Sequence, residues 1–460
     1  MVALSVYVSA SAIVILAVVL GELYVFTLDK EIRARNLRAQ FLCFLECVIL
    51  TMSVIIWRTF GSRRSVRPDS NYVGVASDSK DVGQLQRRRR DQNIRAKIEN
   101  ENTYLSLALR VLLLFYLGSC HLAFACNIFL MAENPHWLSM LTYATFGSLI
   151  QLVTALIIIE AVHYLLKLFS KKKKLFLISS RRWRHLIVVT YTIFISVLGL
   201  YRAAQLPTVK SVSIPISKLP KSLEGFRIVQ LTDIHLGPTV GRRRLEDVVE
   251  IVNSLKPDIV VMTGDLVDGS VQKLKDAVAP MQDIKSVHGK FFIAGNHEYY
   301  TGDVDNWYNH MKELGYIVLH NTNIKLPRTG VKAAQQFCLA GVDDIDAVHL
   351  GYHGHGPDID AALSSCDPTQ PVVVLAHQPR VAKTILDSSY RVDLILSGHT
   401  HGGQMFPMMI GAYLINPFFA GLYQYQGRSY VYVSEGTVYW GIPMRIGSSM
   451  EITEVLLTNR

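Results

Sequence analysis

The stretch Phe291-Phe292-Ile293-Ala294-Gly295-Asn296-His297-Glu298 decides how the second half of this chain is interpreted. Its four apolar residues predict a short buried strand, and Gly295 predicts the turn that ends it. In an α/β sheet, side chains at the carboxyl end of a central strand point into the ligand-binding crevice. Here those side chains are an amide, an imidazole and a carboxylate. Taken alone, residues 295–298 favour an ordinary polar turn, so the flanking sequence has to decide.

Polar residues of the same kind follow several other apolar runs. Asp233-Ile234-His235 and Gly264-Asp265-Leu266-Val267-Asp268 lie upstream, and His377 and Gly398-His399-Thr400-His401 lie downstream. Each group lies where a predicted strand gives way to a turn with glycine nearby. Seven ligand-type residues directly follow such strands: Asp233, His235, Asp265, Asn296, His377, His399 and His401.

The chemistry of these seven side chains predicts a metal centre. Carboxylates combined with neutral imidazoles suit borderline divalent ions such as manganese, zinc or iron. Seven ligands are too many for one tetrahedral ion, so we expect two ions that share a bridging carboxylate. Two ions held in this way stabilise the attacking and leaving oxygens of a phosphoryl displacement. A buried structural histidine is the simpler interpretation of any single position, but not of all seven together.

Residues 226–460 alternate between strand and helix patterns, with apolar residues from Leu245 to Leu255 at helical spacing. Residues 205–225 carry three prolines and predict a linker or an edge segment leaving the bilayer. We therefore expect a layered α/β sandwich, a β-sandwich flanked by helices, with polar residues gathered at strand ends. The expected strands are 226–231, 258–263, 291–294, 316–319, 337–342, 372–376, 392–397, 430–434 and 451–457.

The ordered motifs of residues 226–460 resemble those of the calcineurin-like metallophosphoesterases, whose signature runs D-x-H, G-D-x-x-D, G-N-H-[ED], a lone His and G-H-x-H. The resemblance implies that Asp233, His235 and His401 hold one ion, that Asn296, His377 and His399 hold the other, and that Asp265 bridges them. It also implies that His297 is a catalytic general acid or phosphate contact. Asp268 and Glu298 would orient the metal-bound histidines.

Residues 1–204 are dominated by apolar blocks and predict a multi-span membrane region. A signal peptide is the alternative for residues 1–26, but the missing basic n-region favours an anchor. The stretch 41–57 is a weaker candidate, short and interrupted by Glu46. Residues 58–103 are polar and predict a flexible loop. The firm candidate spans are 3–26, 107–131, 138–162 and 186–204.

The net charge of +10 comes largely from basic runs beside these blocks, such as Arg87–Arg90 and Lys171–Lys174. Such runs determine membrane topology more often than they bind nucleic acid, so we expect no nucleic-acid partner. Basic loops stay in the cytosol, whereas the 132–137 turn carries no basic side chain other than histidine. The catalytic domain is therefore expected on the non-cytosolic side. Basic residues at 30–38 agree only if 41–57 is a buried or interfacial segment rather than a span.

Several further residues have two interpretations. His349, His353 and His355 could form a third metal site, but the glycines around them favour a plain loop. Arg445 could contact phosphate or pair with a surface acid, and Tyr439 and Trp440 could line the pocket or pack in the core. Of the six cysteines, only Cys338 and Cys366 belong to the second half, and no Cys spacing predicts a disulfide scaffold or a zinc finger.

Together these patterns predict a multi-pass, membrane-anchored phosphoesterase. Two divalent ions would activate a hydroxide that hydrolyses a phosphomonoester or phosphodiester, and a lipid-linked phosphate is one candidate. The rival hypothesis is a transporter or sorting protein whose metal-bearing domain no longer catalyses. Glu46 and Glu160 near apolar blocks favour it only weakly, because each looks isolated from basic partners. An intact His297 argues against it. The oligomeric state does not follow from the sequence.

Overall fold

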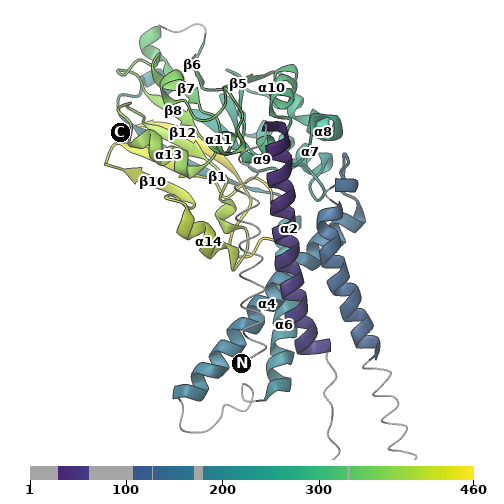
Figure 1. The fold of residues 1–460 in the computed structure, drawn as a ribbon. Helices are drawn as coiled ribbons and strands as arrows, with labels where there is room; N and C mark the ends of the chain where they lie inside the picture. Colours follow the sequence, from purple (N-terminus) through teal and green to yellow (C-terminus); the bar gives the residue numbers. More distant parts are fainter. Residues whose placement is uncertain (1–29, 62–106, 127, 170–179, 329–331) are drawn as a thin grey trace, which may run out of the picture.

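The computed structural model describes residues 30–61, 107–126, 128–169, 180–328 and 332–460. A bundle of long helices leads into a two-sheet domain, and the two parts pack against each other (Figure 1). The expected first span, residues 3–26, and nearly all of the 58–103 loop lie outside the described residues. The rest confirms the predicted fold class, in which membrane-type helices precede a layered α/β sandwich.

Within the described ranges, four helices are long and apolar enough to cross a membrane. Three were firmly expected: Leu107–Cys126, α4 (Trp137–Phe169) and α6 (Arg181–Ala204). The fourth corresponds to the weaker candidate 41–57 and is longer than expected, because α2 runs from Lys30 to Ile56 and continues as the π-helical turn η1 (Trp57–Gly61). Glu46 does not interrupt this helix.

Glu46 and Glu160, the carboxylates within the candidate spans, both have basic partners, contrary to the sequence-based expectation. Glu46 Oε2 lies 2.7 Å from His121 Nδ1, on the helix that ends at Cys126. Glu160 Oε1 lies 2.8 Å from Arg184 Nε, across the contact between α4 and α6. These partners are 75 and 24 residues away in sequence, so sequence spacing gave no sign of them.

The second half of the chain forms two six-stranded sheets. The first has the order β1-β12-β2-β3-β4-β5 and the second β10-β11-β9-β8-β7-β6. Within them, β2, β3, β4 and β5 run parallel, as do β7, β8, β9 and β11. The strands are β1 (Thr208–Ile216), β2 (Phe226–Leu231), β3 (Ile259–Thr263), β4 (Lys290–Ile293), β5 (Tyr316–Val318), β6 (Thr322–Leu326), β7 (Phe337–Gly341), β8 (Val372–Leu375), β9 (Leu394–Ser397), β10 (Gly421–Tyr425), β11 (Ser429–Val433) and β12 (Glu451–Asn459).

Side-chain alternation along the strands builds the layers. Ile228 of β2 enters the core between the sheets, whereas its neighbour Val229 faces the helices outside the first sheet. Apolar residues of α7 (Arg242–Ser254), α8 (Val271–Val278) and α10 (Val304–Glu313) cover that face. Residues of α12 (Ile359–Leu363) and α13 (Pro379–Leu386) cover the second sheet. The remaining short helices are η2 (Lys221–Leu223), η3 (Ala279–Asp283), α9 (Asn296–Tyr300), η4 (Ala333–Gln335), α11 (Asp346–Leu350), η5 (His401–Gly403) and α14 (Met408–Ile415).

The segment 205–225, expected as a linker or an edge segment, contains the edge strand β1. Its nine residues pair in parallel with β12, and three residues separate it from the end of α6. The sequence did not identify this strand because the first half of β1 is exposed and lacks an apolar alternation. Strands β6 and β10 were also missed for this reason, since most of their residues are partly or fully exposed.

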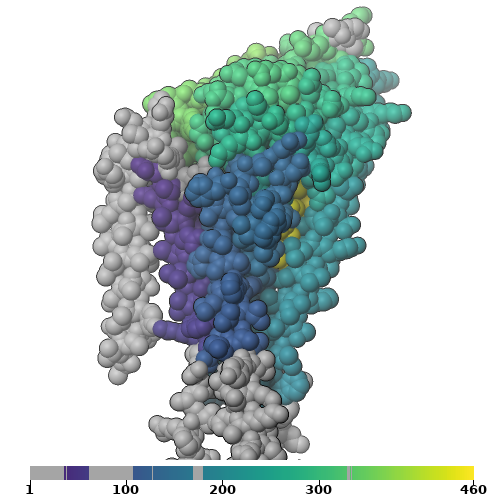
Figure 2. All heavy atoms as spheres, turned by 90° about the vertical axis from the view of Figure 1, so that its right-hand side faces the viewer, coloured from purple at the N-terminus to yellow at the C-terminus, as the bar shows by residue number. Residues whose placement is uncertain are grey.

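Glycines let the sandwich pack directly on the helices. A Cβ on Gly147 of α4 would meet Ile442 and Met444, and one on Gly199 of α6 would meet Ile446. In addition, the Arg445 amide donates a hydrogen bond to the Gly199 carbonyl (3.1 Å). Figure 2 shows this C-terminal segment, in yellow, between the blue and teal helices. The two-sheet domain is therefore packed directly against α4 and α6.

Candidate metal centre

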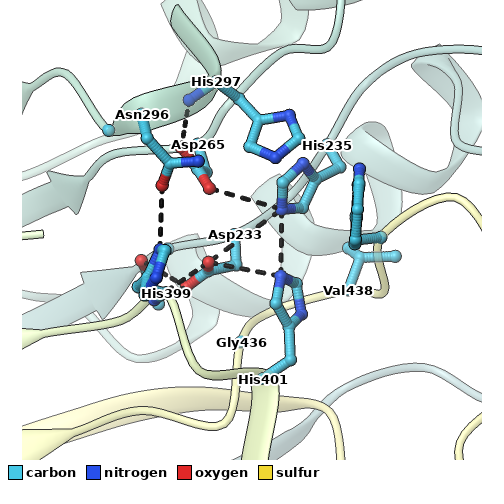
Figure 3. A network of polar contacts seen from close by, with 12 residues as sticks. Asp233, His235, Asp265, Asn296, His297, His399, His401, Gly436 and Val438 are labelled. Carbon is cyan, nitrogen blue, oxygen red and sulfur yellow. Dashed lines mark hydrogen bonds and ion pairs between the residues drawn. The ribbon is translucent and has the colours of Figure 1, made fainter. Parts of the chain in front are cut away.

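The carboxyl ends of five parallel strands bring all seven predicted ligand-type residues together, and Figure 3 labels all of them except His377. In the first sheet, β2 ends before Asp233 and His235, β3 before Asp265, and β4 before Asn296. In the second sheet, β8 ends before His377, and β9 ends before His399 and His401. Six of the seven are buried and His399 is half-buried. Burying carboxylates and imidazoles destabilises the folded state unless these groups are paired or bind a metal.

The first group contains Asp233, His235 and His401. Nε2 of His401 lies 3.0 Å from Nε2 of His235 and 3.3 Å from Oδ1 of Asp233. Two ring nitrogens and a carboxylate oxygen thus converge on one point. Asp233 is further fixed by the His399 amide, which donates to both of its carboxylate oxygens at 3.0 Å.

The second group contains Asn296, His377 and His399. Oδ1 of Asn296 lies 3.0 Å from His377 Nε2 and 2.8 Å from His399 Nδ1. Asp265 lies between the groups, because its Oδ2 is 3.1 Å from His377 Nε2 and 3.7 Å from His235 Nε2. One carboxylate oxygen therefore faces both sets of ligand atoms.

The hydrogen bonding of His377 shows that this arrangement fits a cation. Its Nδ1 donates to the Thr263 carbonyl at 2.8 Å, so Nε2 carries a lone pair in the neutral ring. That lone pair faces oxygens of Asp265 and Asn296, which are also acceptors. Only positive charge between them, a proton or a metal ion, makes the contact favourable. The oxygen and imidazole donor set suits a borderline divalent ion.

Asp268 fixes two imidazole rings at once. Its Oδ1 lies 2.9 Å from Nδ1 of His235 and 2.8 Å from Nδ1 of His297. Burial favours the neutral carboxyl, but the charges of these two rings outweigh it and hold the pKa of Asp268 below its usual range. An Nδ1 proton on His235 leaves its Nε2 directed at the first group. This matches the orienting role expected for Asp268.

His297 lies beside the ligand groups and, like His399, is only partly buried. Its amide donates to Asp265 Oδ1 at 2.8 Å, and 15% of its side chain is exposed. Burial disfavours its charged form, yet the carboxylates of Asp265 and Asp268 raise the pKa of His297 to about 9. The Trp440 ring lies 5.3 Å from the His297 ring, so Trp440 lines the site. Tyr439 is buried in the core instead.

Glu298 has a different role from the one expected. It does not contact a histidine of the two ligand groups by any hydrogen bond among the described residues. Its carboxylate accepts backbone N–H groups of Gly295, Asp265, Leu266 and Val267 at 2.7–3.1 Å. Glu298 therefore holds the turn that carries Asp265 rather than an imidazole ring.

The backbone at the ligand positions is unusual. Five of the seven residues have φ between 52° and 71°, in the left-handed region: Asp233, His235, Asp265, His399 and His401. Each such residue costs roughly 1–3 kcal/mol unless its surroundings compensate. The close approach of Gly295 to Asp265, which leaves no room for a Cβ, is one reason why the sharp turns persist.

Arg445 fits neither interpretation suggested by the sequence. It is 1% exposed and donates hydrogen bonds to the carbonyl oxygens of His401 (2.7 Å) and Val438. Burial lowers the pKa of its guanidinium to about 10. Arg445 therefore braces the turn that carries His401.

The three histidines of the 348–357 loop do not come together. His349 and His353 are exposed, whereas His355 lies near His320 and Asp343. Asp343 already accepts hydrogen bonds from His320 Nδ1 (2.7 Å), the Tyr308 hydroxyl (3.2 Å) and the Gly356 amide (3.2 Å). This second cluster is satisfied by hydrogen bonds alone.

Asp344 was not identified from the sequence. It is 1% exposed, accepts a hydrogen bond from Gln378 at 2.9 Å, and has an Oδ2 atom without a partner among the described residues. Its position after the buried strand β7 was the available signal, since the same rule found the seven ligand-type residues.

The fold and this cluster of residues define a phosphoesterase of the calcineurin-like type. The family model for calcineurin-like phosphoesterases matches residues 226–403. The chain is 39% identical to the "Transmembrane protein with metallophosphoesterase domain" of Danio rerio, over 93% of this chain and 91% of that one. The protein of that name from Bos taurus is 44% identical over 74% of this chain and 79% of its own. An "Uncharacterized metallophosphoesterase" of Helicobacter pylori is 37% identical over 56% of this chain and 66% of its own. The chain therefore belongs to the calcineurin-like phosphoesterase family.

Proposed function

We propose that the protein is a membrane-anchored phosphoesterase that uses two divalent ions to hydrolyse a phosphomonoester or phosphodiester. The observation that carries this proposal is the pair of ligand groups sharing Asp265, with the accessible His297 beside them. Family membership supports the reaction class.

Asp233, His235 and His401 would hold one ion, and Asn296, His377 and His399 the other, with Asp265 shared. Manganese, zinc and iron all suit these donors. When bound, the ions would act as Lewis acids and lower the pKa of water towards neutrality.

The remaining work falls to His297 and its neighbours. Asp268 accepts the Nδ1 proton of His297, so the proton on the opposite ring nitrogen is available to the departing oxygen. The negative charge of Asp268 favours the protonated ring that a general acid requires. Trp440 covers one side of His297 and limits the access of water.

Hydrolysis by the purified full-length chain tests this function. We expect manganese-dependent release of p-nitrophenol from p-nitrophenyl phosphate or from bis(p-nitrophenyl) phosphate, and loss of release in Asp265→Ala, which lacks the carboxylate shared by the two ligand groups. Absence of turnover with manganese, zinc and iron for both compounds would contradict the proposal.

The alternative is that the helices transport or sort a ligand and the domain only binds metal. The pairs Glu46–His121 and Glu160–Arg184 favour it, because ionisable groups between apolar helices often mark a pathway. However, a pure binding module has no use for His297 held by Asp268 at the edge of the site. Metal binding without turnover, together with a phenotype of Glu160→Gln, would favour this alternative.

We also propose that the protein is a multi-pass membrane protein whose catalytic domain faces the non-cytosolic side. The 128–136 turn, which carries no Lys or Arg, contacts this domain: Arg242 donates to the Glu133 carbonyl at 2.8 Å. The C-terminal ends of α2 and α4 lie away from the catalytic domain (Figure 1), and a basic segment of the sequence follows each of these ends. The positive-inside rule then assigns those ends to the cytosol. The basic start of α2, near α11, is an exception to the rule.

A disulfide supports this orientation independently. Cys338 of β7 is bonded to Cys366, which follows α12. Disulfides persist in oxidising compartments and are rare in the cytosol. The two residues were the only cysteines of the second half, but their 28-residue separation did not reveal the bond.

A further inference from the structure

Helix α14 (Met408–Ile415) is apolar on every side, yet only part of its surface packs against the protein. None of its eight residues is buried, and Tyr413, Leu414 and Ile415 are 65%, 74% and 61% exposed. The chain carries no charged residue from Gln404 to Gly427. A surface helix in contact with water normally has one polar face. The exposed side of α14 therefore requires an apolar environment.

The location of α14 indicates which environment this is. The helix lies on the side of the domain that faces the long helices (Figure 1). Just before it, the Phe406 carbonyl accepts a hydrogen bond from the Gln151 side chain of α4 at 2.6 Å. Met405 is fully buried in the cluster formed by α4, including Phe146 and Leu149. Beyond Gln151, α4 exposes Ile157, Ile158 and Leu165. The apolar surface of α14 therefore continues that of a candidate span.

The same helix is tied to the candidate metal centre. The turn η5 begins at His401, and four residues separate it from α14. A Cβ on Gly403 would strike the backbone of Met409, so the turn and the helix touch. On the far side of α14, the Phe419 carbonyl accepts a hydrogen bond from Thr400 Oγ1 at 2.7 Å. Both ends of the segment are thus fixed to the His399–His401 turn.

We propose that α14 lies within the bilayer leaflet nearest the catalytic domain and that the metal centre acts on a phosphate ester of a membrane lipid. The choice of lipid as substrate rests on the proposed phosphoesterase function. Eight residues extend about 12 Å, too short to cross a bilayer but sufficient to lie in its interface. Because α14 is fixed to the ligand turn, its insertion holds the site at the height of the lipid headgroups.

Lipid contact is tested on the full-length chain in phosphatidylcholine nanodiscs. A photoreactive benzoylphenylalanine replaces Leu414 in one variant and Val287 in a control. Val287 is 70% exposed in the loop before β4, away from α14. We expect phospholipid adducts at position 414 and none at position 287. No adduct at 414, or equal labelling at the two positions, would overturn insertion of α14.

The substrate is tested by comparing native protein with the double variant Leu414→Gln, Ile415→Gln and with the control Val287→Gln. The lipid substrates are dioleoyl phosphatidate and dioleoyl phosphatidylglycerol in the nanodisc; the soluble ones are p-nitrophenyl phosphate and bis(p-nitrophenyl) phosphate. In the double variant, we expect lipid turnover to fall about tenfold or more, since two large apolar side chains are lost from the leaflet. Soluble turnover should stay within about twofold, and the control should match native protein.

The outcomes separate this inference from the proposed function. Turnover of soluble esters alone overturns the lipid substrate and leaves the phosphoesterase function standing. Equal lipid turnover in the native protein and the double variant overturns the role of α14. If native protein hydrolyses neither class, the proposed function fails and the lipid substrate with it, while the adducts still decide whether α14 enters the leaflet.

Discussion

Oδ1 of Asp268 lies 2.8 Å from Nδ1 of His297. The same oxygen also accepts a hydrogen bond from Nδ1 of His235. One carboxylate therefore sets the orientation of a proposed metal ligand and of a proposed proton donor. The proposed metal binding and proton transfer would therefore be coupled through a residue that takes part directly in neither.

Replacing Asp268 should impair both of these roles. In Asp268→Asn, the Nδ1 protons lose a charged acceptor, so we expect turnover to fall about 10–100-fold and metal affinity to drop. Rates and metal titrations of the full-length chain check this. The control Asp247→Asn, on the exposed face of α7, should behave like native protein. Native rates in Asp268→Asn would show that Asp268 does not act through these rings.

His297→Ala should separate chemistry from metal binding. The side chain is not assigned to either ion, so metal content should be native while turnover drops about 10²–10⁴-fold. The loss should be smaller for esters with good leaving groups, since these need less protonation. A loss that is equal for good and poor leaving groups would show that His297 is not the proton donor.

Asp265→Ala should reduce the metal content. We expect about two ions per native chain, because seven ligands exceed the needs of one centre. The variant lacks the shared oxygen and should lose at least one of them. Elemental analysis after gel filtration measures this, with Asp247→Ala as the control. Full metal content in Asp265→Ala would exclude Asp265 as the shared ligand.

Asp344 predicts a pH-dependent stability. Burial raises the pKa of Asp344 from 3.8 to about 7, with His377 opposing and Asp346 adding to the shift. Below about pH 3 the Asp344 carboxyl is neutral in both the folded and the unfolded chain. As the pH rises towards 7, the Asp344 carboxyl ionises in the unfolded chain before it does in the folded chain, so the free energy of unfolding falls. Above pH 7 both forms are ionised, and the whole of this loss of stability remains.

Asp344→Asn removes this penalty. It should therefore be more stable than native protein at pH 8, by on the order of 2–4 kcal/mol, and the difference should shrink towards pH 4. Denaturant unfolding of the metal-free chain in detergent, followed by tryptophan fluorescence, measures it. A difference that does not vary with pH would show that Asp344 is ionised in the folded protein.

Engineered glycosylation tests the orientation. The chain contains no Asn-x-Ser/Thr sequon. Asp387→Asn creates one ahead of Ser388 and Ser389, at an exposed position after α13. Val73→Ser completes one that begins at Asn71, in the basic segment after α2. In mammalian cells we expect an endoglycosidase-sensitive mass increase for Asp387→Asn only. Modification of Val73→Ser alone would reverse the assignment.

The sequence predicted the sandwich core and the convergence of the seven ligand-type residues because both depend on buried strands. Short apolar runs mark such strands, and parallel strands bring the residues that follow them to one edge. The exposed strands β1, β6 and β10 have no such pattern. Contacts such as Glu46–His121, Cys338–Cys366 and Arg445–His401 join distant segments, so only the three-dimensional packing reveals them.

Only three residues connect α6 to β1, so the linker between the helices and the two-sheet domain is very short. A domain on a long flexible linker samples a volume that grows with linker length and can reach targets well away from its anchor. Here the glycine contacts at Gly147 and Gly199 lock the domain against its own helices. If the helices cross a membrane as proposed, the domain would reach targets fixed in that membrane only by lateral diffusion of the whole molecule, within one layer of fixed thickness.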